Sequence, residues 1–134
     1  MGVSFTLSHC VRWYRTHSSL GSRALGHKAD EFLLVMTTCP EGAVAKDLAQ
    51  QIVEKKLAAC VSILAPCESV YRWRSGLESS KEVPLMMKTT RARYAPLETF
   101  LRQSHPYELP ELIAVPLTQG LPEYLQWIKD SLRD

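Results

Sequence analysis

The segment Phe32-Leu-Leu-Val-Met-Thr-Thr38 is repeated, with changes, as Pro84-Leu-Met-Met-Lys-Thr-Thr90, 52 positions further along the chain. Each copy is an apolar run of strand length that ends in Thr-Thr. A helical pattern follows each copy, with apolar residues on one face over residues 45–53 and again over 94–101. Further apolar runs, at residues 59–65 and 111–117, come after the two helical patterns and predict two more strands.

Two β-α-β units in series predict an α+β protein with the ferredoxin-like order β-α-β-β-α-β. Right-handed crossovers should place both helices on one face of a four-stranded antiparallel sheet. A last helix is predicted from Pro122 to about residue 132, with the proline in its first turn. The predicted fold is therefore a ferredoxin-like sandwich with a long hairpin between its second and third strands and a C-terminal helix.

The hairpin is too long for a minimal subunit. Counted from residue 59 to residue 75, its outgoing arm has 17 residues, whereas a strand usually has about 5–6. We expect a break at Pro66, a turn at residues 76–80 and a return strand at 81–89. Tyr71 and Trp73 share one face of the outer arm, and such a projecting edge calls for a partner. We interpret it as an oligomerisation arm; the alternative is that it folds back onto its own helices.

Composition predicts one domain at residues 31–134, preceded by a leader at residues 1–30. The leader holds four basic residues against Asp30 alone, and it lacks periodic apolar residues. We expect it to be disordered; a transit segment is the alternative, and no secretory signal pattern is present. The remainder is close to neutral, which does not favour nucleic acid, and no apolar run is long enough for a membrane span. Cysteines without zinc-type spacing indicate reduced thiols and a cytoplasmic location.

Polar residues gather where the second helical pattern meets the last strand. The pair His105-Pro106 predicts the end of the helix, and Tyr107, Glu108 and Glu111 follow at the mouth of the strand. Polar groups at such a junction are well placed to face a cleft. A plainer interpretation of His105 is a cap at the helix C-terminus, where a cation is favoured.

Several separated motifs in one continuous order resemble the CutA divalent-cation-tolerance family. They are Leu57-Ala-Ala-Cys-Val61, Val70-Tyr-x-Trp73 with Gly76 and Glu78, Lys88-Thr89, His105-Pro-Tyr-Glu108, Pro110-Glu111, Gly120, Tyr124-Leu125 and Trp127. The resemblance spans about residues 31–132 and leaves out the leader. It implies a ferredoxin-like subunit in a tight homotrimer, similar to the PII signalling trimers. It also implies a link to copper and other divalent cations, with no established catalytic reaction.

The family's proposed copper site carries over only in part. Its cysteine falls on Thr37 and its two consecutive histidines on Ser104 and His105, so that only His105 matches. Cys39 lies two residues beyond Thr37 and would share its face in a strand. We therefore take His105 and Cys39 as the candidate metal ligands. Imidazole and thiolate suit copper, but this pair predicts only weak binding of Cu²⁺ or another divalent cation, with no organic cofactor.

Two functions of different class follow from these observations. The first is a homotrimer that binds or responds to divalent metal without catalysis, with Tyr71, Trp73 and Trp127 at the trimer interface. The second is a PII-like trimer that senses or converts a small molecule in intersubunit clefts. The residues expected in those clefts are Lys88 as an anion contact, His105 as an acid–base group, Tyr107, Glu108 and Glu111. An RNA-binding sheet, which the fold would allow, would need exposed aromatics with basic neighbours.

Overall fold

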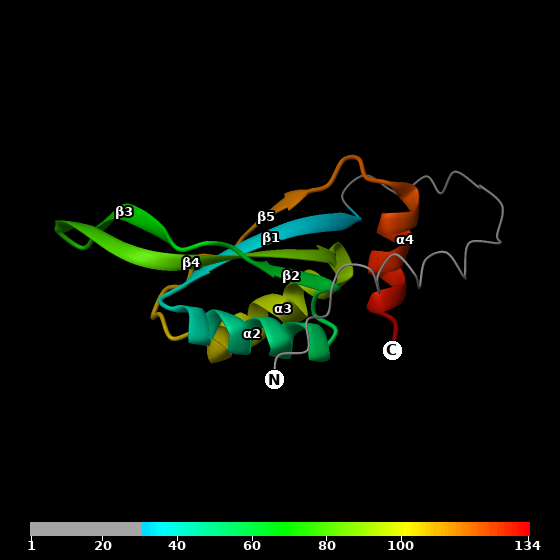
Figure 1. Cartoon of the computed structure of the whole chain (residues 1–134), viewed down its shortest axis with the longest axis horizontal. Coiled ribbons are helices and arrows are strands. Elements are labelled where there is room, and N and C mark those ends of the chain that lie inside the picture. The colour runs from blue at the N-terminus through cyan, green and yellow to red at the C-terminus, as the bar shows by residue number, and fades with distance from the viewer. Residues whose placement is uncertain (1–30) are drawn as a thin grey trace, which may run out of the picture.

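The structure is a computed structural model that describes residues 31–134; the predicted disordered leader, residues 1–30, lies outside the described residues. The elements follow the order β1 (Phe32–Cys39), α2 (Gly42–Glu54), β2 (Cys60–Ile63), β3 (Cys67–Trp73), β4 (Gly76–Thr90), α3 (Arg91–Ser104), β5 (Ile113–Pro116) and α4 (Pro122–Ser131) (Figure 1). The ferredoxin-like fold predicted from the repeat is confirmed. No helix within the described residues is long and apolar enough to cross a membrane.

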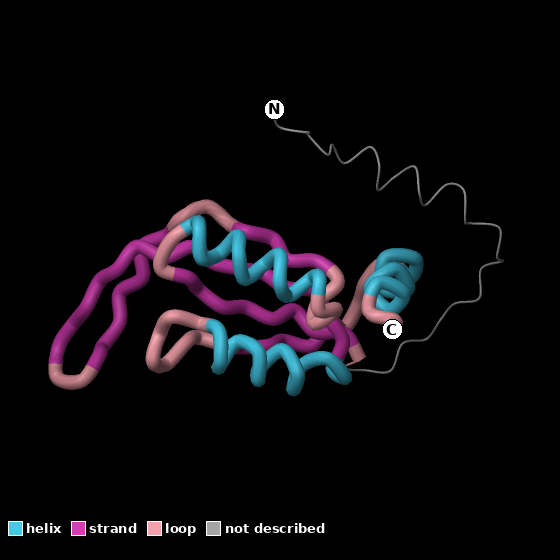
Figure 2. Tube along the Cα trace, turned by 90° about the horizontal axis from the view of Figure 1, so that it is seen from below, coloured by secondary structure: helices cyan, strands magenta, loops and turns pink. Residues whose placement is uncertain are grey.

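The sheet has the strand order β2-β4-β1-β5, with antiparallel pairing throughout, and β3 pairs with the outer part of β4. The predicted four-stranded sheet is thus present and is extended by the hairpin. Helices α2 and α3 lie side by side on one face of the sheet, as the right-handed crossovers require, and α4 stands at one end (Figure 2).

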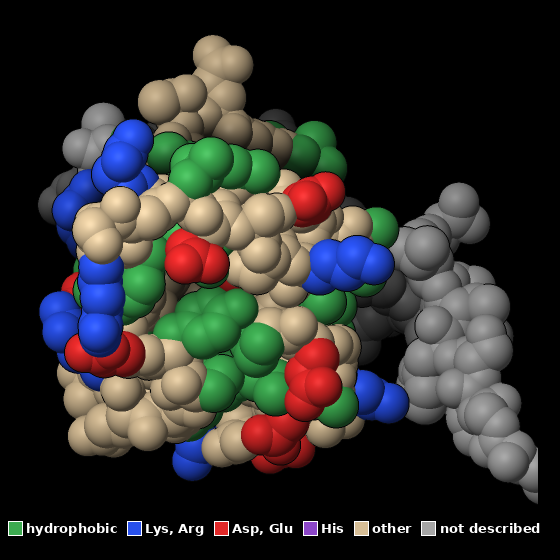
Figure 3. Space-filling view, turned by 90° about the vertical axis from the view of Figure 1, so that its left-hand side faces the viewer, with side chains coloured by type: hydrophobic (Ala, Val, Ile, Leu, Met, Phe, Trp, Pro, Cys, Tyr) green, Lys and Arg blue, Asp and Glu red, His purple; other side chains and the backbone are tan. Residues whose placement is uncertain are grey.

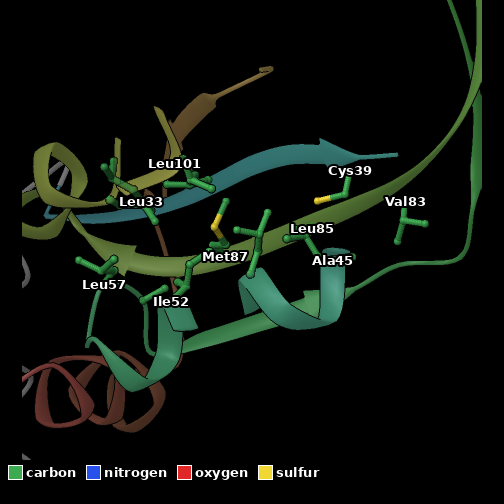
Figure 4. Close-up of a cluster of buried hydrophobic side chains, with 13 residues drawn as sticks. Leu33, Cys39, Ala45, Ile52, Leu57, Val83, Leu85, Met87 and Leu101 are labelled. Atoms are coloured by element: carbon green, nitrogen blue, oxygen red, sulfur yellow. The ribbon is translucent and has the colours of Figure 1, made fainter. Parts of the chain in front are cut away.

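Side chains along β1 and β4 alternate between the two faces of the sheet, and those on the helix side form the main core. Leu33 and Val35 of β1, with Leu85 and Met87 of β4, are buried against the two helices (Figure 4). The helices contribute buried leucines and isoleucine from the faces that the sequence pattern predicts. A second cluster joins α4 to the start of β1 through Phe32, Leu125, Ile128 and Leu132. Burial on this scale is the main stabilising contribution to the fold.

The long arm is broken near Pro66, as predicted, because β2 ends at Ile63 and β3 begins at Cys67. The predicted turn at residues 76–80 is wrong. Gly76 pairs directly with Trp73, so the turn consists of Arg74 and Ser75 alone. The polar residues after Gly76 belong to β4, where cross-strand partners satisfy them: Ser80 bonds Tyr71 at 2.9 Å, and Ser79 bonds Glu68 at 2.7 Å.

Helix α2 ends in a left-handed residue that is not glycine. The backbone of Lys56 has φ 54°; its N–H bonds the carbonyl of Val53, and the N–H of Leu57 bonds that of Ile52. This is the Schellman pattern, in which the left-handed position is usually glycine. Leu57 and Ile52 are both buried, which supplies the apolar contact that accompanies the motif. The left-handed backbone at Lys56 therefore has a steric cost, and it allows the chain to turn from α2 into β2.

At position 56, glycine should be more stable than alanine, because both variants lose the hydrogen bond from Lys56 Nζ to the Arg133 carbonyl and only glycine relieves the left-handed backbone. A side chain in the left-handed region costs about 1–2 kcal/mol, and the extra freedom of glycine in the unfolded chain takes back about 0.5–1 kcal/mol. We expect the free energy of unfolding of Lys56→Gly to exceed that of Lys56→Ala by about 0.5–1 kcal/mol in urea denaturation. The neighbouring Lys55 has φ −81°, so glycine should be less stable than alanine there. The same order of glycine and alanine at both positions would contradict this account.

Candidate functional site

A cavity of about 570 Å³ lies between the projecting hairpin and the segment that follows α3. Its walls come from three parts of the chain: the end of β1, the hairpin strands β3 and β4, and residues 107–111. The lining residues are Thr38, Ser69, Val70, Tyr71, Trp73, Glu82, Tyr107, Glu108, Leu109 and Glu111. Figure 3 views this end of the molecule, where apolar side chains gather at the centre with acidic ones close by.

Glu82 is the most buried acidic side chain of this site, with 8% of its surface exposed. Burial alone would raise the pKa of its carboxyl, but the hydroxyls of Ser69, Thr38 and Tyr107 hold that pKa below its ordinary value. A carboxylate that accepts several hydrogen bonds is favoured in its charged form. Glu82 is therefore an anion at the base of the cavity, fixed by hydroxyls from three separate segments.

Tyr107 is the member of this network that reaches over from the segment after α3. Burial, the hydrogen bond that it donates to Glu82 and the charge of that carboxylate raise the pKa of the phenol to about 12. The hydroxyl therefore keeps its proton at neutral pH and acts as a donor. Tyr107 and Glu82 therefore lie near each other in the cavity wall, one from residues 107–111 and the other from strand β4.

His105 sits directly after α3, as the His-Pro pair predicts, and it is buried. Its Nε2 lies 2.8 Å from the carbonyl oxygen of Thr38, and its Nδ1 accepts a hydrogen bond of 3.1 Å from the backbone N–H of Tyr107. Since Nδ1 accepts, Nε2 must carry the proton and donate it to Thr38. Both ring nitrogens are therefore engaged with the backbone, and neither is directed to an open coordination position.

The other family ligand positions also have structural partners. Thr37 is fully buried, and its hydroxyl donates to the carbonyl of Glu111 at 2.6 Å. Cys39 shares the face of Thr37, as the strand pattern predicts, and burial followed by the nearby charge of Glu82 raises the pKa of its thiol to about 11. A protonated, buried thiol is a poor metal ligand. Ser104 is exposed at the end of α3.

The fit of these residues to a metal ion within one subunit is therefore poor. Within residues 31–134, no three side chains of His, Cys, Asp or Glu lie close enough together to hold one ion. His105 would have to give up a hydrogen bond, and Cys39 would have to lose a proton inside the core. In this chain, the residues at the family's ligand positions instead join β1 to the segment after α3.

The structure brings together Tyr107, Glu108 and Glu111, three of the residues predicted to line a cleft. Lys88 lies elsewhere, on the sheet face opposite α2 and α3, where it donates to Ser62 at 2.8 Å. Sequence reasoning missed Thr38 and Glu82. The sequence held one signal for Glu82: it is an acidic residue immediately before the buried run that starts at Val83. A charge at such a position must find partners.

The residues predicted for a trimer interface occupy two places. Tyr71 and Trp73 line the cavity on the inner face of the hairpin, with 41% and 38% of their surfaces exposed. Trp127 lies on α4, stacked on Tyr124 with ring centroids 5.4 Å apart. The most exposed apolar residues of the hairpin are instead Val70 and Leu77, at 65% and 75%. The side chains of these two residues alternate with Tyr71 and Trp73. Leu77 lies on the outer face, and Val70 also borders the cavity.

These features define a class: a ferredoxin-like subunit with a projecting hairpin and a carboxylate-lined cavity at its base. The model of the CutA1 divalent ion tolerance protein family matches residues 33–131. The chain belongs to this family, as the sequence resemblance predicts.

Relatives and solved structures agree with this assignment. The Protein CutA homolog of Xenopus laevis is 40% identical over 117 residues, which cover 84% of this chain and 78% of the frog protein. The Divalent-cation tolerance protein CutA of Citrobacter koseri is 41% identical over 103 residues, or 77% of this chain and 90% of that protein. The crystal structure of CutA from Xylella fastidiosa matches with a TM-score of 0.75 and 39% identity, over 77% of this chain and 99% of that chain.

The hydrogen bonds to Glu82 predict a pH-dependent contribution to stability. Its pKa in the folded protein lies below the ordinary value of 4.5. The stabilisation is therefore present above about pH 4.5 and is lost as the pH falls through the folded pKa. We expect Glu82→Gln to lower the free energy of unfolding at neutral pH by roughly 1.5–3 kcal/mol, the range for hydrogen bonds to charged groups.

Urea denaturation at a series of pH values measures this effect. The difference between Glu82→Gln and the unmutated protein should shrink on acidification. Glu78→Gln is the matched control, since Glu78 is exposed on the same strand and should change stability by no more than about 0.5 kcal/mol. A difference that stays constant down to the acid limit would show that Glu82 is not held as an anion.

Proposed function

We propose that this chain is the subunit of a homotrimeric divalent-cation-tolerance protein. It binds, or responds to, Cu²⁺ or another divalent cation weakly, and it performs no catalysis of its own. The family assignment supports the link to divalent cations. The observation that carries the trimer is the projecting hairpin, whose outer face and free edge call for a partner.

The hairpin has an open edge as well as an apolar face. The inner half of β4, from Val83 to Thr90, pairs with β1. Within the described residues, the outer half, residues 76–82, pairs with β3 on one side and has no strand on the other. Unpaired backbone groups next to exposed Val70 and Leu77 form a surface that proteins cover or protect. Further copies of the same hairpin would cover this surface, and a closed rotational symmetry would leave no copy uncovered.

Weak metal binding is what the site geometry supports. A cation could use His105 only after the imidazole released the Thr38 carbonyl or the Tyr107 N–H, and that loss reduces the net affinity. In a trimer, ligands from different subunits could be pooled, which would raise the number of donors without changing this cost. The protein therefore has a role in the response to metal, and no chemical step is assigned to the metal.

The second candidate function is the sensing or conversion of a small molecule. The observation that favours it is the cavity of about 570 Å³ beneath the hairpin, a volume in the range of ligand pockets in general. In a trimer formed through the hairpins, this cavity would lie close to a neighbouring subunit.

The trimer predicts a mass of three times 15.2 kDa in sedimentation equilibrium. Placing charges on the outer face, in the double variant Val70→Glu/Leu77→Glu, should shift the mass to that of one subunit, because buried unpaired carboxylates are costly. Val53→Glu is the control, since Val53 is 43% exposed on α2, away from the hairpin; it should leave the trimer intact. A single-subunit mass for the unmutated protein would refute the proposal.

Copper binding is tested by calorimetric titration of the unmutated protein, His105→Ala and Cys39→Ser. We expect weak binding that changes little in either variant, because both side chains have structural tasks. His105→Ala should instead lower the free energy of unfolding by roughly 1–3 kcal/mol, since it leaves two backbone groups without their partner. Tight binding that His105→Ala abolishes, in a variant that still forms the trimer, would make His105 a ligand after all.

A further inference from the structure

We infer that the cavity beneath the hairpin binds a small organic cation, of the ammonium or guanidinium class, between aromatic rings and carboxylates. The inference names the ligand for the small-molecule function considered above and rests on that function. It does not rest on the trimer, because every lining residue used in the argument comes from one chain.

Aromatic rings supply one half of the site. Tyr71 and Trp73 project from the inner face of β3, and Tyr107 faces them from the segment after α3. The Tyr107 ring lies against that of His105, with the centroids 4.9 Å apart, and the Tyr71 hydroxyl is held 2.9 Å from that of Ser80. Aromatic rings gathered around an open volume are the arrangement that recognises ammonium groups, since the face of each ring carries partial negative charge.

Carboxylates supply the other half. Glu82, Glu108 and Glu111 line the same cavity. Within residues 31–134 its lining contains no Lys, Arg or His side chain. The basic groups next to the lining are His105, whose ring centroid lies 4.9 Å from that of Tyr107, and Arg74 at the exposed rim. The Arg74 Nη2 lies 3.8 Å from Glu108, and its guanidinium lies 5.9 Å from the centre of the Trp73 ring, where a bound cation would compete with it. Glu82 is bound by hydroxyl groups, which satisfy its hydrogen bonds but leave its negative charge in place. The cavity therefore favours a cation and rejects an anion.

The spacing of the carboxylates separates an organic cation from a metal ion. In the described part of the chain, these carboxylates do not form a group of three that could hold one ion, whereas a divalent metal requires several oxygen ligands at about 2.0–2.6 Å. A larger cation can contact the rings and carboxylates from a distance through its alkyl groups or several N–H donors. The cavity volume of about 570 Å³ is also far greater than a bare ion needs.

Calorimetric titration with choline tests the inference, with 3,3-dimethylbutan-1-ol as its neutral isostere and agmatine as a guanidinium probe. We expect at least one of the cations to bind with a Kd of about 1 mM or below, with a change in tryptophan fluorescence, and the neutral isostere to bind at least tenfold more weakly. Trp73→Leu and Glu111→Gln should each weaken cation binding about five- to tenfold, in line with one lost ring or charge contact.

Glu123→Gln, which removes an exposed carboxylate on α4, is the matched control and should leave binding unchanged. Sedimentation of each variant shows whether the oligomer is preserved, so that a loss of assembly is not taken for a loss of binding. If the neutral isostere binds as well as choline and Trp73→Leu weakens both, a small-molecule site stands but the cation class is wrong. If neither cation binds, the inference is overturned; the trimer and the metal response are unaffected, because sedimentation and the copper titration test them separately.

Discussion

The pairing of one long strand with three others is the constraint on which the structure depends. β4 spans 15 residues; its inner half lies between β1 and β2, and its outer half carries β3 into the hairpin. Glu82 pairs with Cys67 and Val83 with Cys39, so the acidic residue sits where β4 leaves the sheet. Because side chains alternate along a strand, Val83 enters the core while Glu82 points to the other face, toward the cavity.

The Glu82 carboxylate lies at this crossing point, next to hydroxyl groups from three other segments. Thr38 comes from β1, Ser69 from β3 and Tyr107 from the segment after α3, and all three direct hydroxyls at it. His105 adds a second connection between the same segments through the Thr38 carbonyl and the Tyr107 N–H. A buried carboxylate is costly to desolvate, so such a network stabilises a fold only when its partners are complete. Among the described residues, no buried side-chain polar atom lacks a hydrogen-bond partner.

The sequence predicted the parts of the structure that depend on local periodicity. The repeat of Phe32–Thr38 at Pro84–Thr90 indicated the fold, the His-Pro pair marked the end of α3, and Pro66 marked the break in the arm. It failed where long-range partners decide the outcome. The residues after Gly76 are typical of a turn, yet pairing with β3 makes them strand. The His105 imidazole bonds a carbonyl 67 positions away, and no local pattern reports that contact.

Alternation along β3 also separates the two roles assigned to the hairpin. Tyr71 and Trp73 face the cavity, whereas Leu77 is exposed on the other side of the same two-stranded ribbon and Val70 borders the cavity. An oligomer contact on the outer face therefore need not fill the cavity, and a cation bound inside need not compete with a neighbouring subunit. For the same reason a change on one face leaves the side chains of the other in place. Assembly and ligand binding are thus separable at single residues such as Leu77 and Trp73, whereas Val70 borders both surfaces.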